Sequence, residues 1–113
     1  ALENGVSQVE EVKGRFPQIA GLKFSWTADV APNEGRVSDV MVMQDGAWAP
    51  IDPSATYGLV SNNYVRGGGD GYKMFRSAMN AYDFGPDLAD VLAEYMAQNA
   101  PYQPYTDGRI QKK

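Results

Sequence analysis

The residues with the clearest capacity for chemistry lie in a glycine-rich segment from Asn62 to Tyr72. This segment holds four glycines around one carboxylate, Asp70, and an aromatic ring, Tyr64, stands six residues before that carboxylate. Glycine reaches positive φ without steric penalty and lets another group approach the backbone closely, and an ordinary turn needs fewer glycines. The spacing therefore predicts a loop that binds a ligand. The alternative is a long flexible connection that binds nothing.

Other residues near this pattern have two possible roles. Phe16 lies between Gly14 and Pro17 in a segment without strand or helix periodicity, so its ring either binds a ligand or fastens a loop to the core. Asp70 either accepts hydrogen bonds from a ligand or stabilises its own loop as an Asx turn. Weaker candidates, whose side chains could instead satisfy backbone groups or remain solvated, are Asn62, Asn63 and Arg66.

Composition narrows the function classes. The chain has 113 residues, enough for one domain, and a net charge of −4, which argues against binding a nucleic-acid polymer because that affinity comes mainly from Lys and Arg. It has no cysteine, which excludes disulfides and thiolate metal sites, and no histidine, the usual nitrogen ligand of catalytic zinc and dinuclear phosphatase sites. Any catalytic metals are therefore expected outside this chain.

Two pairs of carboxylates could be considered as a general acid and base. Asp87 and Asp90 suit the N-terminus of a helix, where acidic side chains complement the helix dipole. Glu10 and Glu11 lie in a polar connection without an apolar wall to raise a pKa. All four are expected to be solvated or to cap a helix.

Hydrophobic periodicity predicts strands followed by a helix. The predicted elements are strands over 22–26, 37–43 and 57–61, a tight hairpin turn at Asp45-Gly46, a helix that starts with Pro86 at its first position and ends near Asn99, and an edge strand near 108–110. Residues 73–80 fit either a short helix or a strand. Ala1 to Val6 are typical of the last turn of a helix with Gly5 at the C′ position, which predicts that most of this helix lies upstream. No segment has the ~20 apolar residues of a membrane helix.

Together with its neighbours, the glycine-rich segment resembles the C-terminal domain of the 5'-nucleotidase family, bacterial periplasmic or secreted metallophosphoesterases that remove phosphate from nucleotides. The element Gly68-Gly69-Asp70-Gly71-Tyr72, with an aromatic residue six positions before its aspartate, is the most specific match. The other matching residues, in the family's order and at similar spacing, are Ala1 to Val6, Gly14 to Gln18, Gly21 to Phe24, Arg36-Val37, Tyr57, Asn63-Tyr64 and Gly108-Arg109-Ile110.

The resemblance implies an α/β fold, part of a layered α/β/β/α domain with helices outside two sheets, here truncated at its N-terminal side. Residues 1–113 would form part of a substrate-binding domain, and a metallophosphoesterase domain would precede it in the same protein. That domain would bind two divalent metal ions and perform the hydrolysis, so this chain alone is expected to be inactive and to hold no cofactor. The family's phosphate-binding arginines would lie, at least in part, before Ala1.

The resemblance also implies roles for individual residues. The base of the nucleotide would be held between the rings of Phe16 and Tyr64, and stacking of this kind contributes about 1–3 kcal/mol per base. Asp70, beside Gly68 and Gly69, would accept hydrogen bonds from ribose hydroxyls. Many relatives place Phe at the position of Tyr64, and the added hydroxyl is expected to reach water or a polar group of the ligand.

The implied function is nucleotide binding within a 5'-nucleotidase-like phosphomonoesterase of nucleotide catabolism, located in the periplasm or outside the cell. Its partners would be a nucleotide or nucleoside and the N-terminal domain of the same protein. The alternative is a non-catalytic binding or interaction module whose glycine-rich loop is only structural.

Overall fold

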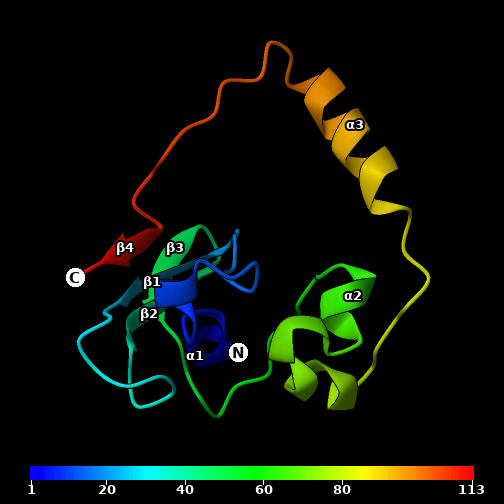
Figure 1. The fold of residues 1–113 in the computed structure, drawn as a ribbon. Helices are drawn as coiled ribbons and strands as arrows, with labels where there is room; N and C mark the ends of the chain where they lie inside the picture. The colour runs from blue at the N-terminus through cyan, green and yellow to red at the C-terminus, as the bar shows by residue number, and fades with distance from the viewer.

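The computed structural model describes all residues from Ala1 to Lys113 (Figure 1). Its helices are α1 (Leu2–Gly5), α2 (Asn63–Arg66) and α3 (Leu88–Gln98), its strands are β1 (Leu22–Trp26), β2 (Val37–Gln44), β3 (Ala47–Pro50) and β4 (Ile110–Lys112), and its short 3-10 helices are η1 (Val9–Glu11), η2 (Gly69–Gly71) and η3 (Lys73–Ser77). The combination of one sheet with helices confirms the predicted α/β class.

The four strands form one sheet in the order β3-β2-β1-β4. Asp45 and Gly46 both adopt positive φ, at 49° and 80°, and join β2 to β3 in the predicted tight hairpin. The last strand returns to the sheet and pairs parallel with β1, with Phe24 opposite Ile110. The predicted edge strand is therefore confirmed, although it starts at Ile110 and not at Gly108.

The core is small and lies where the N-terminal segment meets the sheet and the glycine-rich loop. Its buried apolar side chains are Val6, Phe24, Val42 and Tyr72. The alternation predicted for 22–26 holds only in part, because Phe24 and Ser25 are both buried. The register between β1 and β2 shifts at this point, where β2 carries an extra residue and Asp39 has a φ of 52°.

Three predictions of local structure are wrong in detail. Residues 57–61 form no strand, because no neighbouring segment pairs with them. Helix α3 begins at Leu88, and its N-cap is Asp87, whose carboxylate accepts a hydrogen bond from Ala89 N at 2.8 Å. Pro86 therefore precedes the cap, and the prediction that it is the first helical residue is wrong. Gly5 is the last residue of α1 and not its C′ residue: a Cβ there would lie 2.7 Å from Pro17 Cδ and 2.8 Å from the Tyr72 hydroxyl, so close packing requires the glycine.

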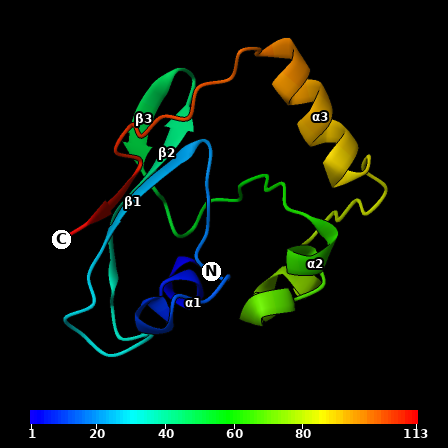
Figure 2. The same cartoon turned by 45° about the horizontal axis from the view of Figure 1, so that its top comes forward.

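Helix α3 stands apart from the sheet, linked to the rest of the chain by extended segments (Figures 1 and 2). None of its residues is buried, and its apolar side chains, predicted from their helical spacing, remain exposed. None of the helices has the length and apolar character needed to cross a membrane.

Candidate functional site

The glycine-rich segment starts with a capped helix. Asn62 precedes α2, and its side-chain oxygen accepts a hydrogen bond from Val65 N at 2.8 Å. This contact confirms the alternative in which an asparagine before a loop satisfies backbone groups. After α2 the chain adopts positive φ at Gly68, Asp70 and Gly71, with values of 87°, 51° and 83°. These left-handed conformations fold the backbone into a tight turn that contains Asp70.

Side chains of the chain itself pack against the glycines of this loop. A Cβ built on Gly69 would lie 2.5 Å from the ring of Tyr64, and one on Gly71 would lie 2.5 Å from Asn4 Oδ1. A Cβ on Gly68 would lie 2.5 Å from Nε of Arg76. The glycines are therefore needed for close packing within the molecule, and the loop has a defined shape.

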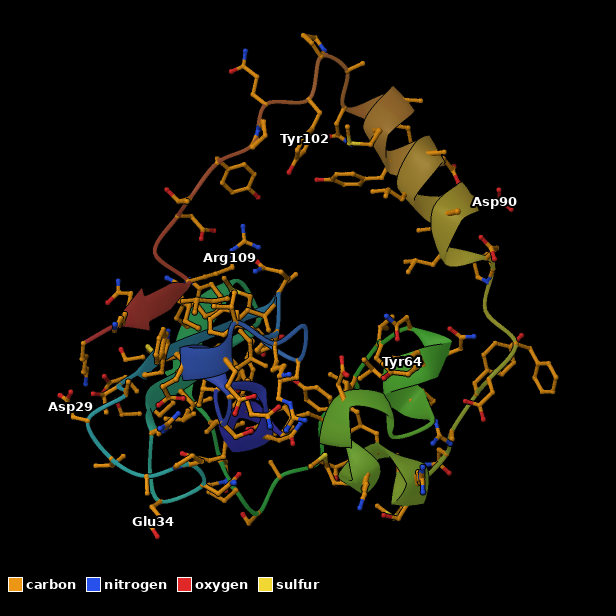
Figure 3. The ribbon with its side chains drawn as sticks, viewed as in Figure 1. Asp29, Glu34, Tyr64, Asp90, Tyr102 and Arg109 are labelled. Atoms are coloured by element: carbon orange, nitrogen blue, oxygen red, sulfur yellow. The ribbon has the colours of Figure 1, made fainter.

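Tyr64 and Asp70 form the centre of the candidate site. The Tyr64 hydroxyl donates a hydrogen bond to Asp70 Oδ1 at 3.1 Å, while 59% of the tyrosine surface remains exposed. Figure 3 shows Tyr64 on α2. From the sequence we expected the hydroxyl to reach water or a ligand, but it binds the carboxylate of the same loop. An exposed ring beside a fixed carboxylate can stack on a flat ring and accept a hydrogen bond from a hydroxyl group next to that ring.

The loop is docked onto the N-terminal segment. The Asn4 amide donates to the backbone oxygen of Asp70 at 3.0 Å and accepts from Arg15 at 3.4 Å. The hydroxyl of buried Tyr72 donates to the backbone oxygen of Arg15 at 2.7 Å, and burial raises the pKa of Tyr72, which keeps it a donor. A Cβ on Gly14 would lie 4.0 Å from Asp70 Oδ2, so the second carboxylate oxygen faces the segment that carries Phe16.

Phe16 is half-buried and contacts the core. Its ring packs edge-on against Trp26, with centroids 5.8 Å apart and planes at 69°. Its segment lies beside Asp70, but Phe16 and Tyr64 form no aromatic pair with each other. The structure thus brings Tyr64, Gly69 and Asp70 together, places the Phe16 segment next to them, and also gives Phe16 a packing role.

The remaining candidates have structural roles or no side-chain partner. Arg66 is not simply solvated: it donates to Phe75 O at 2.7 Å and forms an ion pair with Asp83 at 3.0 Å. Gly68 packs against a side chain of the molecule, as described above, and Asn63 is exposed.

No role was assigned from the sequence to Asn4, Arg15 and Tyr72, which hold the loop in place. Arg15 Nη1 donates to Asn4 and to the hydroxyl of Ser7, while its Nε is buried without a partner. No local pattern could have found these residues, because Asn4 and Asp70 are 66 positions apart. The match of the sequence around Asn4, Arg15 and Tyr72 to the family was the available signal.

The carboxylates outside the loop do not form a catalytic pair. Glu10 is not merely solvated, since it binds buried Arg36, and this hydrogen bond holds the pKa of Glu10 below its ordinary value. Glu11 forms an exposed ion pair with Lys13 at 3.5 Å, and Asp87 caps α3 as predicted. The structure contains no group of three or more His, Cys, Asp or Glu side chains placed so that they could hold a metal ion.

A hollow of about 280 Å³, separate from the Tyr64 site, lies where the chain before β4 passes the segment at Ile19. Arg109, labelled in Figure 3, is the one cation among the residues that line this hollow. Its guanidinium donates to Asp107 and to Ile19 O, both at 2.8 Å, and lies over the ring of Tyr105. The charge of Arg109 is thus paired within the chain.

Comparisons with known proteins agree with the fold and the loop. A family model described as the 5'-nucleotidase C-terminal domain matches residues 1–77. The crystal structure of a 5'-nucleotidase precursor from Thermus thermophilus superposes with a TM-score of 0.91 at 34% identity, over 99% of this chain and 22% of that one.

Curated relatives are also nucleotide phosphoesterases by name. A trifunctional nucleotide phosphoesterase of Bacillus subtilis is 34% identical over 99% of this chain, and an NAD 5'-nucleotidase of Haemophilus influenzae is 34% identical over 90% of it. The chain spans 8% and 18% of their respective lengths. With its α/β sheet, its glycine-rich loop and these matches, the chain belongs to the 5'-nucleotidase C-terminal domain family.

Proposed function

We propose that residues 1–113 are part of the substrate-binding domain of a 5'-nucleotidase-like phosphomonoesterase and bind the nucleoside part of a nucleotide. The pairing of the exposed Tyr64 ring with the Asp70 carboxylate is the observation that carries this proposal. A base can stack on the ring, and a carboxylate beside it can accept hydrogen bonds from the sugar. Phe16 would supply the second ring from the neighbouring segment, and Gly69 allows the close approach of Tyr64.

The hydrolysis itself would take place in a metallophosphoesterase domain that precedes this one in the same protein. Two divalent metal ions would activate the attacking water there. The residues of this chain do not fit such a centre, because it has no histidine and no cluster of acidic ligands. The role of this chain is then to bind and orient the nucleoside, so that the phosphate points to the other domain.

We also propose a location in the periplasm or outside the cell. The Thermus relative is described as a precursor, a description that fits an exported and processed protein. The proposed partners are the nucleotide and the N-terminal domain, and the net charge of −4 disfavours a nucleic-acid polymer.

The proposal can be tested in the full-length protein with Phe16→Ala, Tyr64→Ala and Asp70→Asn. Each ring substitution should lower kcat/KM for adenosine monophosphate by about 5- to 150-fold, the equivalent of 1–3 kcal/mol of stacking. Asp70→Asn should lower it for nucleotides only. A simple aryl phosphate serves as the control substrate, since it has no base or ribose. Equal losses on both substrates would mean that these residues support the fold and not the nucleoside.

One observation favours a second candidate, a non-catalytic module with a structural loop. Three glycines of the loop are packed by side chains of the chain itself, as a purely structural connection would require. Nucleoside binding separates the two candidates: a module of this kind should show no change in the amide spectrum of Tyr64 or Asp70 when a nucleoside is added.

A further inference from the structure

We infer that the Tyr64 hydroxyl determines how the site recognises the sugar. Its hydrogen bond to Oδ1 of Asp70 uses one acceptor position of that oxygen and weakens it for a ligand, so the site holds one hydroxyl of the sugar, through Oδ2, more strongly than a second. This inference rests on the proposed nucleoside-binding function. It concerns the hydroxyl of Tyr64, whereas the proposed function uses only its ring.

The hydrogen bond between Tyr64 and Asp70 is fixed by packing on the tyrosine side. The ring lies so close to Gly69 that three of its carbons would be 2.5–2.6 Å from a Cβ at that position. From this place its hydroxyl reaches Asp70 Oδ1 at 3.1 Å. The ring cannot move toward Gly69, so the hydroxyl remains beside the carboxylate unless the whole side chain swings outward.

Asp70 is fixed by its backbone. Its φ is 51°, and Gly68, two residues before it, and Gly71, directly after it, also have positive φ. Its backbone oxygen accepts the amide of Asn4 at 3.0 Å. With Oδ1 directed to Tyr64, Oδ2 is the oxygen near Gly14, on the side of the segment that carries Phe16. Oδ2 accepts no hydrogen bond from the chain and is not buried, so it is the acceptor left for a ligand beside this segment.

The chemistry of a carboxylate makes this arrangement selective. Its two oxygens can accept hydrogen bonds from two adjacent donors, such as the 2'- and 3'-hydroxyls of ribose. Each oxygen has two lone pairs, so Oδ1 can still accept, but a sugar hydroxyl there shares the oxygen with the Tyr64 donor and gains less than a hydroxyl at Oδ2. With phenylalanine in this place both oxygens would be available. A hydrogen bond to a charged group changes an equilibrium by about ten-fold or more, which sets the expected effect.

The test uses the full-length protein and kcat/KM for adenosine 5'-monophosphate and its 2'-deoxy and 3'-deoxy forms. In the unaltered protein, at least one deoxy form should be used within about two-fold of the ribonucleotide. In Tyr64→Phe both deoxy forms should be used about ten-fold less well than the ribonucleotide. Tyr82→Phe is the matched control, because Tyr82 is 77% exposed and its hydroxyl has no hydrogen-bond partner in the structure.

The outcomes separate this inference from the proposed function. The two ratios to compare are kcat/KM for the ribonucleotide divided by kcat/KM for each deoxy form. If Tyr64→Phe leaves both ratios unchanged or lowers them, while Asp70→Asn reduces the preference for the ribonucleotide, the inference is overturned and nucleoside binding by Asp70 stands. If Asp70→Asn also leaves both ratios unchanged, ribose recognition by this loop is wrong and the inference falls with it. A rise in both ratios in Tyr82→Phe would likewise overturn the inference, because the effect would not be specific to Tyr64.

Discussion

Replacing Gly69 with alanine tests whether the position of the Tyr64 ring matters for binding. Gly69 is not in the left-handed region of φ, so its backbone accepts an alanine. The new methyl group, however, would lie 2.5 Å from Cε1 and Cζ of Tyr64. Carbon atoms pack at about 3.5–4.0 Å, so the ring must retreat by about 1 Å or more. The hydrogen bond from Tyr64 to Asp70, 3.1 Å long, cannot survive a shift of this size away from the loop.

The effects on stability should nearly cancel. Loss of the exposed hydrogen bond costs about 1 kcal/mol. Replacing glycine with alanine at a compatible backbone position stabilises by about 0.4–1 kcal/mol, since the unfolded chain loses freedom. The free energy of unfolding should therefore change by less than about 1 kcal/mol. Nucleotide use should fall much more, by about 5- to 150-fold, because the ring no longer stands where a base can stack.

The assay compares kcat/KM for adenosine monophosphate and for an aryl phosphate in the full-length protein, together with urea unfolding. Gly58→Ala is the matched control, because a Cβ at Gly58 would meet nothing within 4 Å and its φ is not positive. If Gly69→Ala impairs both substrates equally, the ring supports the fold and not the base. If it impairs neither, the position of Tyr64 against Gly69 has no part in binding.

Three further predictions follow from the structure. Because the hydrogen bond from Arg36 lowers the pKa of Glu10, this pair stabilises the fold above the ordinary glutamate pKa, and its contribution is lost as the pH falls through the lowered value. In urea unfolding, the free energy of unfolding of Glu10→Gln should therefore fall less steeply with decreasing pH between about pH 5 and pH 3 than that of the unaltered protein. An equally steep fall in Glu10→Gln and in the control Glu11→Gln would contradict this. Residues 1–113 alone should release no phosphate from nucleotides with added manganese, cobalt, zinc or magnesium, since they lack a metal-ligand cluster; chelator-sensitive turnover proportional to chain concentration would refute it. Amides of α3 should exchange with solvent faster than those of β1 and β2 in residues 1–113, because 11 residues with none buried form a marginal helix, and equal protection would show that another surface covers α3.

Features that depend on neighbouring residues could be predicted from the sequence. The Asp45-Gly46 turn needs only two residues with positive φ, and both adopt it. Helix α3 follows from its own apolar spacing. Its exact start was placed wrongly, because Pro86 suits a first helical position and Asp87 suits a cap, and the sequence alone does not show which of the two applies. The strand expected at 57–61 failed because an apolar run becomes a strand only beside a partner, and the sequence does not show whether one is near.

The candidate site, too, could be predicted only where it depends on residues close together in the sequence. The glycine-rich loop and its carboxylate could be located from composition and spacing, and the resemblance supplied expected roles. The contacts that hold the loop could not be predicted, because they join residues far apart in the chain: the hydroxyl of Tyr72 reaches Arg15 across 57 positions. Nor could the partner of the Tyr64 hydroxyl be predicted, since it depends on how the loop curls back on α2.

The packing of the loop bears on the choice between a ligand site and a flexible connection. A flexible connection would leave its glycines free, whereas Gly68, Gly69 and Gly71 are each in close contact with a side chain. The loop is thus ordered before any ligand arrives. A binding site that is already ordered avoids the cost of immobilising a loop on association, which is about 0.5–1.5 kcal/mol for each ordered side chain. Contacts that look purely structural therefore also suit the proposed function, because they hold the Tyr64 ring and Asp70 in the positions that the proposed nucleoside site uses.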